Sequence, residues 1–197
     1  MKLLRAFIAI EIPTHIHQKI AAQTASLREN IASSLVRWVP IVNIHLTLKF
    51  LGDVLPAKTE QLSQMLDELA HSYKAHEIQI SGLGAFPNPR QVRIIWIGIQ
   101  APDTLHTLQT GLETASAKLG FPPENRPFHP HLTLGRVKQG ISPAGAQSIQ
   151  AALANTKIGH IGTVRIEALH LFKSDLKPSG AVYTKLYSAP LSDIQTR

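Results

Sequence analysis

The chain has 197 residues, which suits one compact domain or one domain of two lobes. Apolar residues make up 44% and charged residues 17%, so a sizeable core can be buried and intrinsic disorder is disfavoured. The absence of cysteine excludes disulfides, thiolate metal sites and a cysteine nucleophile. The formal charge of +7 favours a polyanionic partner such as RNA, DNA or a nucleotide, although the basic residues are scattered.

The first 13 residues are superficially similar to a signal peptide. Arg5 and Glu11 interrupt the apolar run, and no small-residue cleavage site follows. The alternation of apolar and polar residues fits a buried strand better, and no stretch is long enough to span a bilayer. We therefore expect a soluble, cytoplasmic protein that does not contact membranes, with a monomer as the default state.

The first half of the chain predicts alternating strands and helices. Three strands are expected, at residues 5–12, 36–39 and 44–52. Pro13 ends the first strand and Thr14 can cap a helix after it, while a second helix is expected over residues 58–72. The apolar stripes of the two helices are Ile16, Ile20, Leu27 and Ile31, then Leu62, Met65, Leu66 and Leu69.

The same order then begins again. Residues 92–99 predict a strand that Pro102 ends, and Asp103 can cap a helix that turns inward Leu105, Leu108, Leu112 and Leu119. A proline-rich loop leads to His131. The interval from Pro102 to His131 differs by only three residues from the interval from Pro13 to His45. This indicates an internal duplication, since two copies are too few for a solenoid.

The end of the chain predicts a hairpin. Residues 162–176 and 180–191 would be its two arms, with Pro178, Ser179 and Gly180 in the turn. Together the elements predict a single α+β domain over residues 1–197. Two pseudo-symmetric lobes would each carry an antiparallel sheet packed by helices, with the ligand cleft between them.

The repeated word HLTL occupies residues 45–48 and 131–134. Because successive side chains of a strand point to opposite faces, His45 and Thr47 would share one face while the leucines anchor the strand. The same holds for His131 and Thr133. Two such strands related by an approximate twofold axis would place two imidazoles and two hydroxyls around one point.

A phosphate suits that point, because four hydrogen-bonding groups and no carboxylate would surround it. The pKa of histidine lies close to neutrality, so one imidazole can be neutral while the other is protonated. The neutral ring can take a proton from an attacking water or hydroxyl, and the charged ring can protonate the leaving oxygen. The threonine hydroxyls would hold the non-bridging oxygens. The identical words leave open which histidine has which role.

A metal site is the alternative for these histidines. His129 and His131 are two residues apart, as are His15 and His17, and zinc can use such pairs. No cysteine is available and no acidic residue adjoins either HLTL word, although Glu124 is nearby in sequence. We therefore expect neither metal nor cofactor, and a structural role for His129. Trp38 and Trp96 are expected in the core or at its rim.

The quoted residues resemble the two-histidine phosphoesterase superfamily, whose signature is a pair of HxT/Sx motifs. The stretches RAFIAIEIP, NIHLTLKFLGDV, RPFHPHLTLGR and VYTKLY are most similar to the bacterial and archaeal RNA 2′,3′-cyclic phosphodiesterases, also called 2′-5′ RNA ligases. The resemblance implies a bilobal α+β fold and metal-independent hydrolysis of a terminal 2′,3′-cyclic phosphate on RNA, giving a 2′-phosphate. It implies His45 as proton donor, His131 as proton acceptor, and reversible 2′-5′ joining of RNA ends.

The resemblance also points to residues that bind the substrate. Phe50 could stack on a base and Arg136 could bind phosphate, although strict alternation places both opposite the histidines. Both would reach the cleft only if the strand twists, bulges or ends first. The alternative for Phe50 is packing in the core, and the alternative for Arg136 is a place on a solvated edge. Tyr183 and Lys185, in the terminal strand, are further candidates for lining the cleft. The expected partners are RNA ends with cyclic phosphates, tRNA fragments being one candidate, or nucleotides.

Two other functions remain open at this point. The chain could be a non-catalytic module that binds RNA or nucleotides, although Lys or Arg would serve binding as well as paired histidines. It could also be a phosphodiesterase of small cyclic nucleotides or of an ADP-ribose cyclic phosphate, which the sequence barely separates from an enzyme of RNA ends.

Overall fold

The computed structural model describes residues 3–177 and 180–192. The strands are β1 (Leu4–Glu11), β2 (Val36–Trp38), β3 (His45–Val54), β4 (His76–Phe86), β5 (Ile94–Gln100), β6 (His131–Val137), β7 (His160–Ile166), β8 (Ala168–Lys177) and β9 (Gly180–Pro190). The helices are α1 (Thr14–Asn30), α2 (Thr59–His71), α3 (Asp103–Lys118) and α4 (Pro143–Asn155), with short 3-10 turns at η1 (Ile41–Asn43) and η2 (Pro56–Lys58).

All strands belong to one curled antiparallel sheet. Its order is β7-β4-β5-β6-β3-β1-β8-β9, and β2 pairs with the remaining length of β6. The sheet has two halves of four strands, which join where Leu46 of β3 pairs with Leu132 of β6. The predicted α+β fold with two similar halves is thus confirmed, and the two expected sheets are continuous through the HLTL strands.

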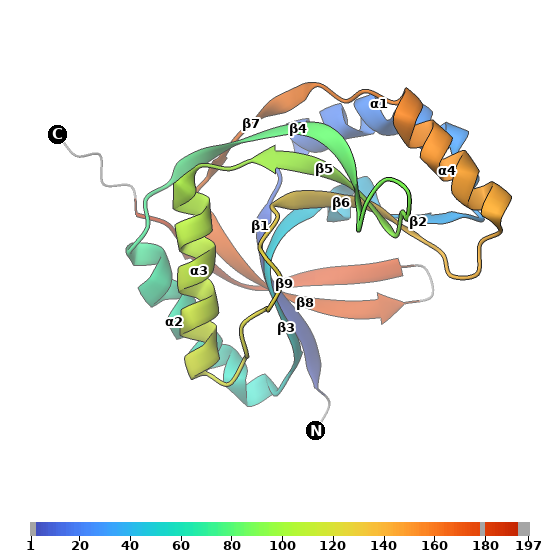
Figure 1. Ribbon diagram of the computed structural model, residues 1–197. Helices are drawn as coiled ribbons and strands as arrows, with labels where there is room; N and C mark the ends of the chain where they lie inside the picture. Colours follow the sequence, from blue (N-terminus) through green and yellow to red (C-terminus); the bar gives the residue numbers. More distant parts are fainter. Residues whose placement is uncertain (1–2, 178–179, 193–197) are drawn as a thin grey trace.

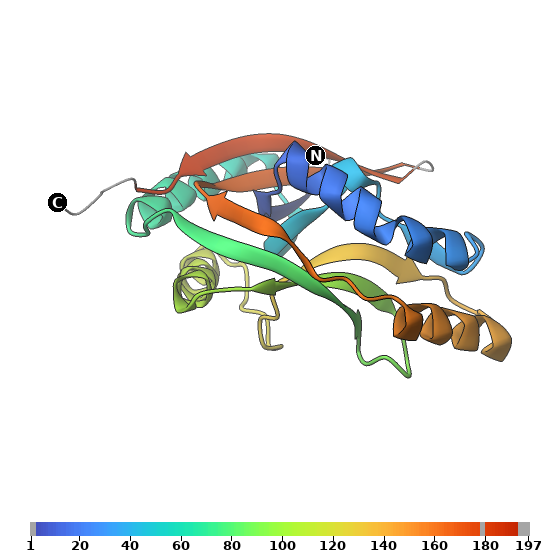
Figure 2. The same ribbon diagram turned by 90° about the horizontal axis from the view of Figure 1, so that it is seen from above.

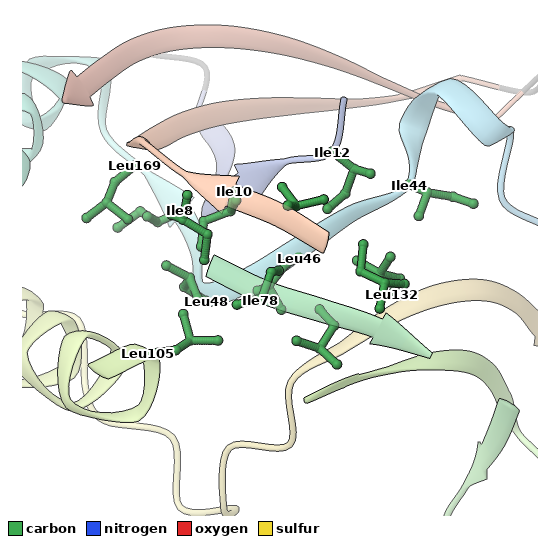
Figure 3. Packing of buried hydrophobic residues seen from close by; sticks show 14 of the residues in the cluster. Ile8, Ile10, Ile12, Ile44, Leu46, Leu48, Ile78, Leu105, Leu132 and Leu169 are labelled. Carbon is green, nitrogen blue, oxygen red and sulfur yellow. The ribbon is translucent and has the colours of Figure 1, made fainter. Parts of the chain in front are cut away.

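The helices are grouped in pairs. Figures 1 and 2 show α2 beside α3 at one end of the sheet, and α1 with α4 at the other. The apolar faces of these helices and one face of the sheet form a single large core. Figure 3 shows Leu46 and Leu48 in this core near Ile8 and Ile10 of β1, and Leu132 further along, below Ile44. The leucines of both HLTL words therefore anchor their strands as predicted, which leaves the histidines on the other face.

The expected helix caps are wrong by one residue. Thr14 and Asp103 are the first residues of α1 and α3, and neither preceding residue forms a side-chain cap. Pro13 and Pro102 take the cap position with extended backbone, and their carbonyls accept the first helical hydrogen bonds, from Ile16 and Leu105. A proline can do this because the cap residue contributes its carbonyl and needs no N–H inside the helix.

The predicted terminal hairpin is confirmed as β8–β9, but its first arm is shorter than expected. The stretch 162–176 breaks at Glu167: the part before it belongs to β7, which pairs with β4 in the other half of the sheet. Glu167 lies between the two strands, where the chain crosses from one half to the other. Pro178 and Ser179, expected in the turn, lie outside the described residues.

Three elements were not foreseen, namely β4, α4 and the separate strand β7. The start of α4 carried a readable signal, since Ser142 accepts a hydrogen bond from the Gly145 N–H and Pro143 occupies the first turn. In the described part of the chain, no helix combines the length and apolarity needed to cross a membrane.

Candidate active site

The two HLTL words lie side by side in the middle of the sheet. Since β3 and β6 are antiparallel with Leu46 opposite Leu132, the register places Thr133 opposite His45 and His131 opposite Thr47. All four polar side chains therefore project from the face opposite the core, which we call the histidine face. The two histidines are diagonal neighbours in this register, a relationship with a Cα separation of about 8 Å.

Each imidazole is oriented by a carbonyl two residues before it. The Nδ1 atom of His45 lies 2.8 Å from the carbonyl oxygen of Asn43, and that of His131 lies 2.6 Å from the carbonyl oxygen of His129. Because a carbonyl only accepts, both Nδ1 atoms carry the donated proton. Each Nε2 is left to exchange a proton with a ligand, and among residues 3–177 and 180–192 neither has a hydrogen-bond partner.

Aromatic side chains hold the two rings in place. The His45 ring stacks on Phe7 with centroids 4.8 Å apart, and the Tyr183 ring lies perpendicular to it with centroids 5.2 Å apart. On the other side, Phe86 lies 5.0 Å from the His131 ring in an edge-on arrangement. These contacts restrict the ring planes and remove water from one side of each imidazole.

The pKa of both histidines is lowered. Burial is the main cause for His45, and the carbonyl of Asn43 partly offsets it. Burial also lowers the pKa of His131 against the opposing effect of the His129 carbonyl, and the positive charge of Arg136 lowers it further. Both imidazoles thus favour the neutral form, and a bound anion would shift both back toward the charged form.

A β-bulge after each HLT segment decides where Phe50 and Arg136 point. In the β1–β3 pair the register passes from Ala9–Thr47 to Ile8–Lys49, so β3 contains one extra residue at Leu48. The extra residue reverses the alternation. Lys49 shares the core face with Ile8, and Phe50 joins the histidine face, where 64% of it is exposed.

The second word has the same bulge. The β5–β6 register passes from Trp96–Thr133 to Ile95–Gly135, so Leu134 is the extra residue. Gly135 then faces the core and Arg136 faces the same side as Thr133. The bulge foreseen as one condition for Phe50 and Arg136 to reach the site is therefore present in both strands, and each side chain is exposed beside its HLT segment.

Lys49 shows what the first bulge does on the core side. It is buried, forms an ion pair with Glu113 at 2.5 Å and donates to the carbonyl of Pro122 at 2.9 Å. Glu113 also accepts a hydrogen bond from the backbone N–H of Glu124. This network fixes the start of the proline-rich loop to β3 and α3, and that loop leads to the carbonyl that orients His131.

The remaining expected residues differ in their placement. Tyr183 lies beside the His45 ring, and burial raises its pKa while Arg136 and Arg5 lower it, so the phenol stays protonated. Lys185 instead pairs with Glu11 at 2.5 Å, so its charge is already compensated. Trp96 is half-buried on the histidine face, with its ring 6.3 Å from that of His131.

Sequence reasoning missed two groups of residues. Phe7 and Phe86 contact the catalytic candidates, but an apolar residue in a strand reads as core until the strands are paired. The carbonyls of Asn43 and His129 were also missed, although both precede their histidine by two residues. The Asn43 side chain further donates to the carbonyl of Ala181, which ties β9 to the residue that orients His45.

No group of three potential ligands suited to a metal ion occurs in the described part of the chain. Two surface hollows lie away from the histidines. One separates α4 from the segment before β5, and the other lies between α2 and β9. The histidine face itself carries two imidazole Nε2 atoms, two hydroxyls, one phenol and the Arg136 guanidinium. Glu11, the register partner of His45, lies on the same face and pairs with Lys185.

Comparison with known proteins gives a consistent result. The family model LigT like Phosphoesterase matches residues 10–96 and again residues 97–183. An RNA 2′,3′-cyclic phosphodiesterase of Methanothermobacter thermautotrophicus is 33% identical over 183 residues, covering 93% of this chain and 96% of the relative. The Archaeoglobus fulgidus protein of the same name is 31% identical, with 93% and 98% covered.

Solved structures are similar over almost the whole chain. A protein of Thermus thermophilus superposes with a TM-score of 0.77 at 27% identity, covering 96% of this chain and 99% of the other. Escherichia coli LigT complexed with 3′-AMP gives a TM-score of 0.75 at 26% identity, with 97% and 99% covered.

Proposed function

The chain belongs to the LigT-like phosphoesterase family, and we propose that it hydrolyses terminal 2′,3′-cyclic phosphates of RNA to 2′-phosphates without a metal. The observation that carries this proposal is the pair of Nε2 atoms on one face of the sheet. In each ring a carbonyl holds Nδ1, and Nε2 has no hydrogen-bond partner in the described part of the chain. The relatives named RNA 2′,3′-cyclic phosphodiesterase support the substrate class.

The proposed reaction is an in-line displacement at phosphorus. His131 takes a proton from water, and the water oxygen bonds to phosphorus. The bond from phosphorus to the 3′-oxygen breaks, and protonated His45 gives its proton to that oxygen. This polarity is the one that the family resemblance implies. Burial lowers the pKa of both histidines, and the charge of Arg136 adds to this effect at His131, the proposed base.

The other groups of the histidine face would bind the substrate. Thr47 and Thr133 would donate hydrogen bonds to the non-bridging oxygens as their charge grows. Arg136 supplies a positive charge near His131, and the exposed ring of Phe50 offers a surface on which a base can stack. Tyr183, protonated and beside His45, can donate a hydrogen bond to the substrate from the half of the sheet that carries His45.

The same geometry supports joining of RNA ends. If the 5′-hydroxyl of a second RNA end replaces water, its oxygen bonds to phosphorus while the bond to the 3′-oxygen breaks; His131 takes the proton of the hydroxyl and His45 gives its proton to the 3′-oxygen. Attack of the 3′-hydroxyl on the resulting 2′-5′ linkage, with the 5′-oxygen leaving, is the reverse step. We accordingly propose reversible 2′-5′ joining of RNA ends as a minor activity, and a monomer that acts on RNA fragments or nucleotides in the cytoplasm.

The test is hydrolysis of an oligoribonucleotide with a 2′,3′-cyclic phosphate, in buffer with EDTA. His45→Ala and His131→Ala should each lower the rate by about 10²–10⁴, the usual contribution of a general acid or base. His15→Ala is the control, because His15 is exposed on α1, a helix that packs against the core face of the sheet, and it should keep full activity. Full activity in either site variant would refute the proposal, and wild-type binding without turnover would favour a non-catalytic module.

A further inference from the structure

Two arginines on neighbouring strands stand directly opposite one another. In the β2–β6 pair, Arg37 is the register partner of Arg136. Directly opposite residues of an antiparallel pair project from the same face, with Cβ atoms about 5 Å apart. Because Arg136 faces the histidine side, Arg37 does so too, and both are exposed.

This pair lacks a compensating charge among the residues that the structure describes. Elsewhere on the surface, Arg126 pairs with Glu124 and Lys173 with Asp175. No carboxylate among residues 3–177 and 180–192 pairs with Arg37 or Arg136, and the other register neighbour of Arg136 is Ile94. Like charges directly opposite one another destabilise a sheet. An anion held between the two guanidinium groups would remove this repulsion.

The position of the pair suits the second phosphate of a strand. With Leu134 as the extra residue of the bulge, Arg136 is two regular strand steps from Thr133, which corresponds to about 7 Å. Arg37 lies beside it on β2, which continues along the edge of β6 that β3 pairs with. A single strand that leaves the reaction centre in this direction would present its next phosphodiester to two guanidinium forks, whose planar donors match phosphate oxygens.

We propose that Arg37 and Arg136 together bind the phosphodiester that precedes the terminal nucleotide, so that the site prefers the 3′ end of an RNA strand to a free cyclic mononucleotide. The inference rests on the proposed function for the location of the terminal phosphate. It adds Arg37 as a residue that determines specificity, which touches the substrate one nucleotide away from the reacting atoms.

The test measures the activity of the wild-type protein and of two variants on two substrates. Wild-type protein, Arg37→Gln and Arg90→Gln are assayed with a cyclic-phosphate dinucleotide and with a nucleoside 2′,3′-cyclic phosphate. Arg37→Gln should lose about tenfold in kcat/KM on the dinucleotide, as expected for a charged hydrogen bond, and less than about twofold on the mononucleotide. Arg90 is exposed on the segment between β4 and β5, and its variant should match the wild type on both. An equal loss on both substrates, or no loss on either, would overturn the proposal.

A charge reversal separates binding from folding. Arg37→Glu would pair with Arg136, so its melting temperature should equal or exceed that of the wild type while its affinity for the dinucleotide falls further than that of Arg37→Gln. A lowered melting temperature together with unchanged affinity would show that Arg37 serves the fold and would refute the proposal.

A binding measurement makes this inference independent of turnover. A dinucleotide ending in a 2′-phosphate should bind wild-type protein about tenfold more tightly than a nucleoside 2′-phosphate, and Arg37→Gln should abolish the difference. If this holds but no cyclic phosphate is hydrolysed, the proposed function fails and the subsite stands. If hydrolysis occurs but both ligands bind equally, the subsite fails and the proposed function stands.

Discussion

Phe50 and Arg136 occupy the same place in the two halves of the sheet, each two regular steps beyond a threonine and on the same face as a histidine. Both positions depend on one extra residue in the strand, Leu48 in β3 and Leu134 in β6. The duplication therefore repeats the backbone geometry of the site but changes the side chain at this position. It is an aromatic ring in β3 and a guanidinium in β6.

Replacement of Phe50 should weaken binding without affecting the fold. The ring is 64% exposed, so Phe50→Ala removes little buried surface and should leave the melting temperature within about 2 °C of the wild type. Loss of a base stack costs about 1–3 kcal/mol, so KM for a cyclic-phosphate oligonucleotide should rise at least fivefold at little-changed kcat. Phe50→Trp should retain binding. A large loss of stability in Phe50→Ala would show that the ring belongs to the core instead.

Removal of the threonine hydroxyls should slow the chemical step. Thr47→Val and Thr133→Val keep the shape and strand preference of the side chain, and each should lower kcat by about 10²-fold, because one donor to the developing charge is lost. Thr→Ser at the same positions keeps the hydroxyl and should restore most of the rate in single-turnover assays. If valine and serine variants turned over equally well, the hydroxyls would have no part in stabilising the transition state.

The pH dependence should be bell-shaped and centred on the acidic side of the ordinary histidine pKa. One imidazole must be charged and the other neutral, and the maximum of such a profile lies midway between their two pKa values. Burial lowers both from 6.5, so the maximum of kcat/KM should lie below pH 6.5. Arg136→Gln removes a charge that lowers the pKa of His131 and should move the profile toward higher pH. A maximum above pH 7 in the wild type would contradict these environments.

The same shifts bear on stability. Between the lowered pKa values of the folded state and 6.5, the unfolded chain binds more protons than the native protein at His45 and His131. The free energy of unfolding should therefore fall as the pH decreases below about 6.5, and this part of the slope should be smaller when both histidines are replaced by glutamine. Denaturant titrations of both proteins at several pH values measure it.

Gly84 tests how closely the aromatic support of His131 is packed. A Cβ atom at Gly84 would lie 2.2 Å from ring carbons of Trp96, which must then move away. Gly84→Ala should destabilise the protein by about 1–3 kcal/mol and lower kcat, because Trp96 lies next to the His131 ring. Gly159→Ala is the control, since its Cβ would meet nothing within 4 Å and should have little effect on either quantity. Equal stability of the two variants in urea would argue against this packing.

The sequence alone predicted the parts of the site that follow strand periodicity. The placement of His45 and Thr47 opposite Leu46 required only the two-residue repeat of a strand and one repeated word. The two bulges could not be read, because HLTLKF continues a regular apolar alternation and HLTLGR keeps it through Leu134, while a bulge is set by the register with the neighbouring strand. The opposition of Arg37 and Arg136 was hidden for the same reason, since 99 residues separate two positions that only sheet pairing brings together.

The most direct test of the central claim is a titration of the wild-type protein with inorganic phosphate, followed by NMR at the ring nitrogens of His45 and His131. If both imidazoles contact one phosphoryl group, their signals should shift together with a single dissociation constant and one phosphate per chain, and the pKa of both should rise. Signals that respond with different constants, or a response from only one ring, would contradict it.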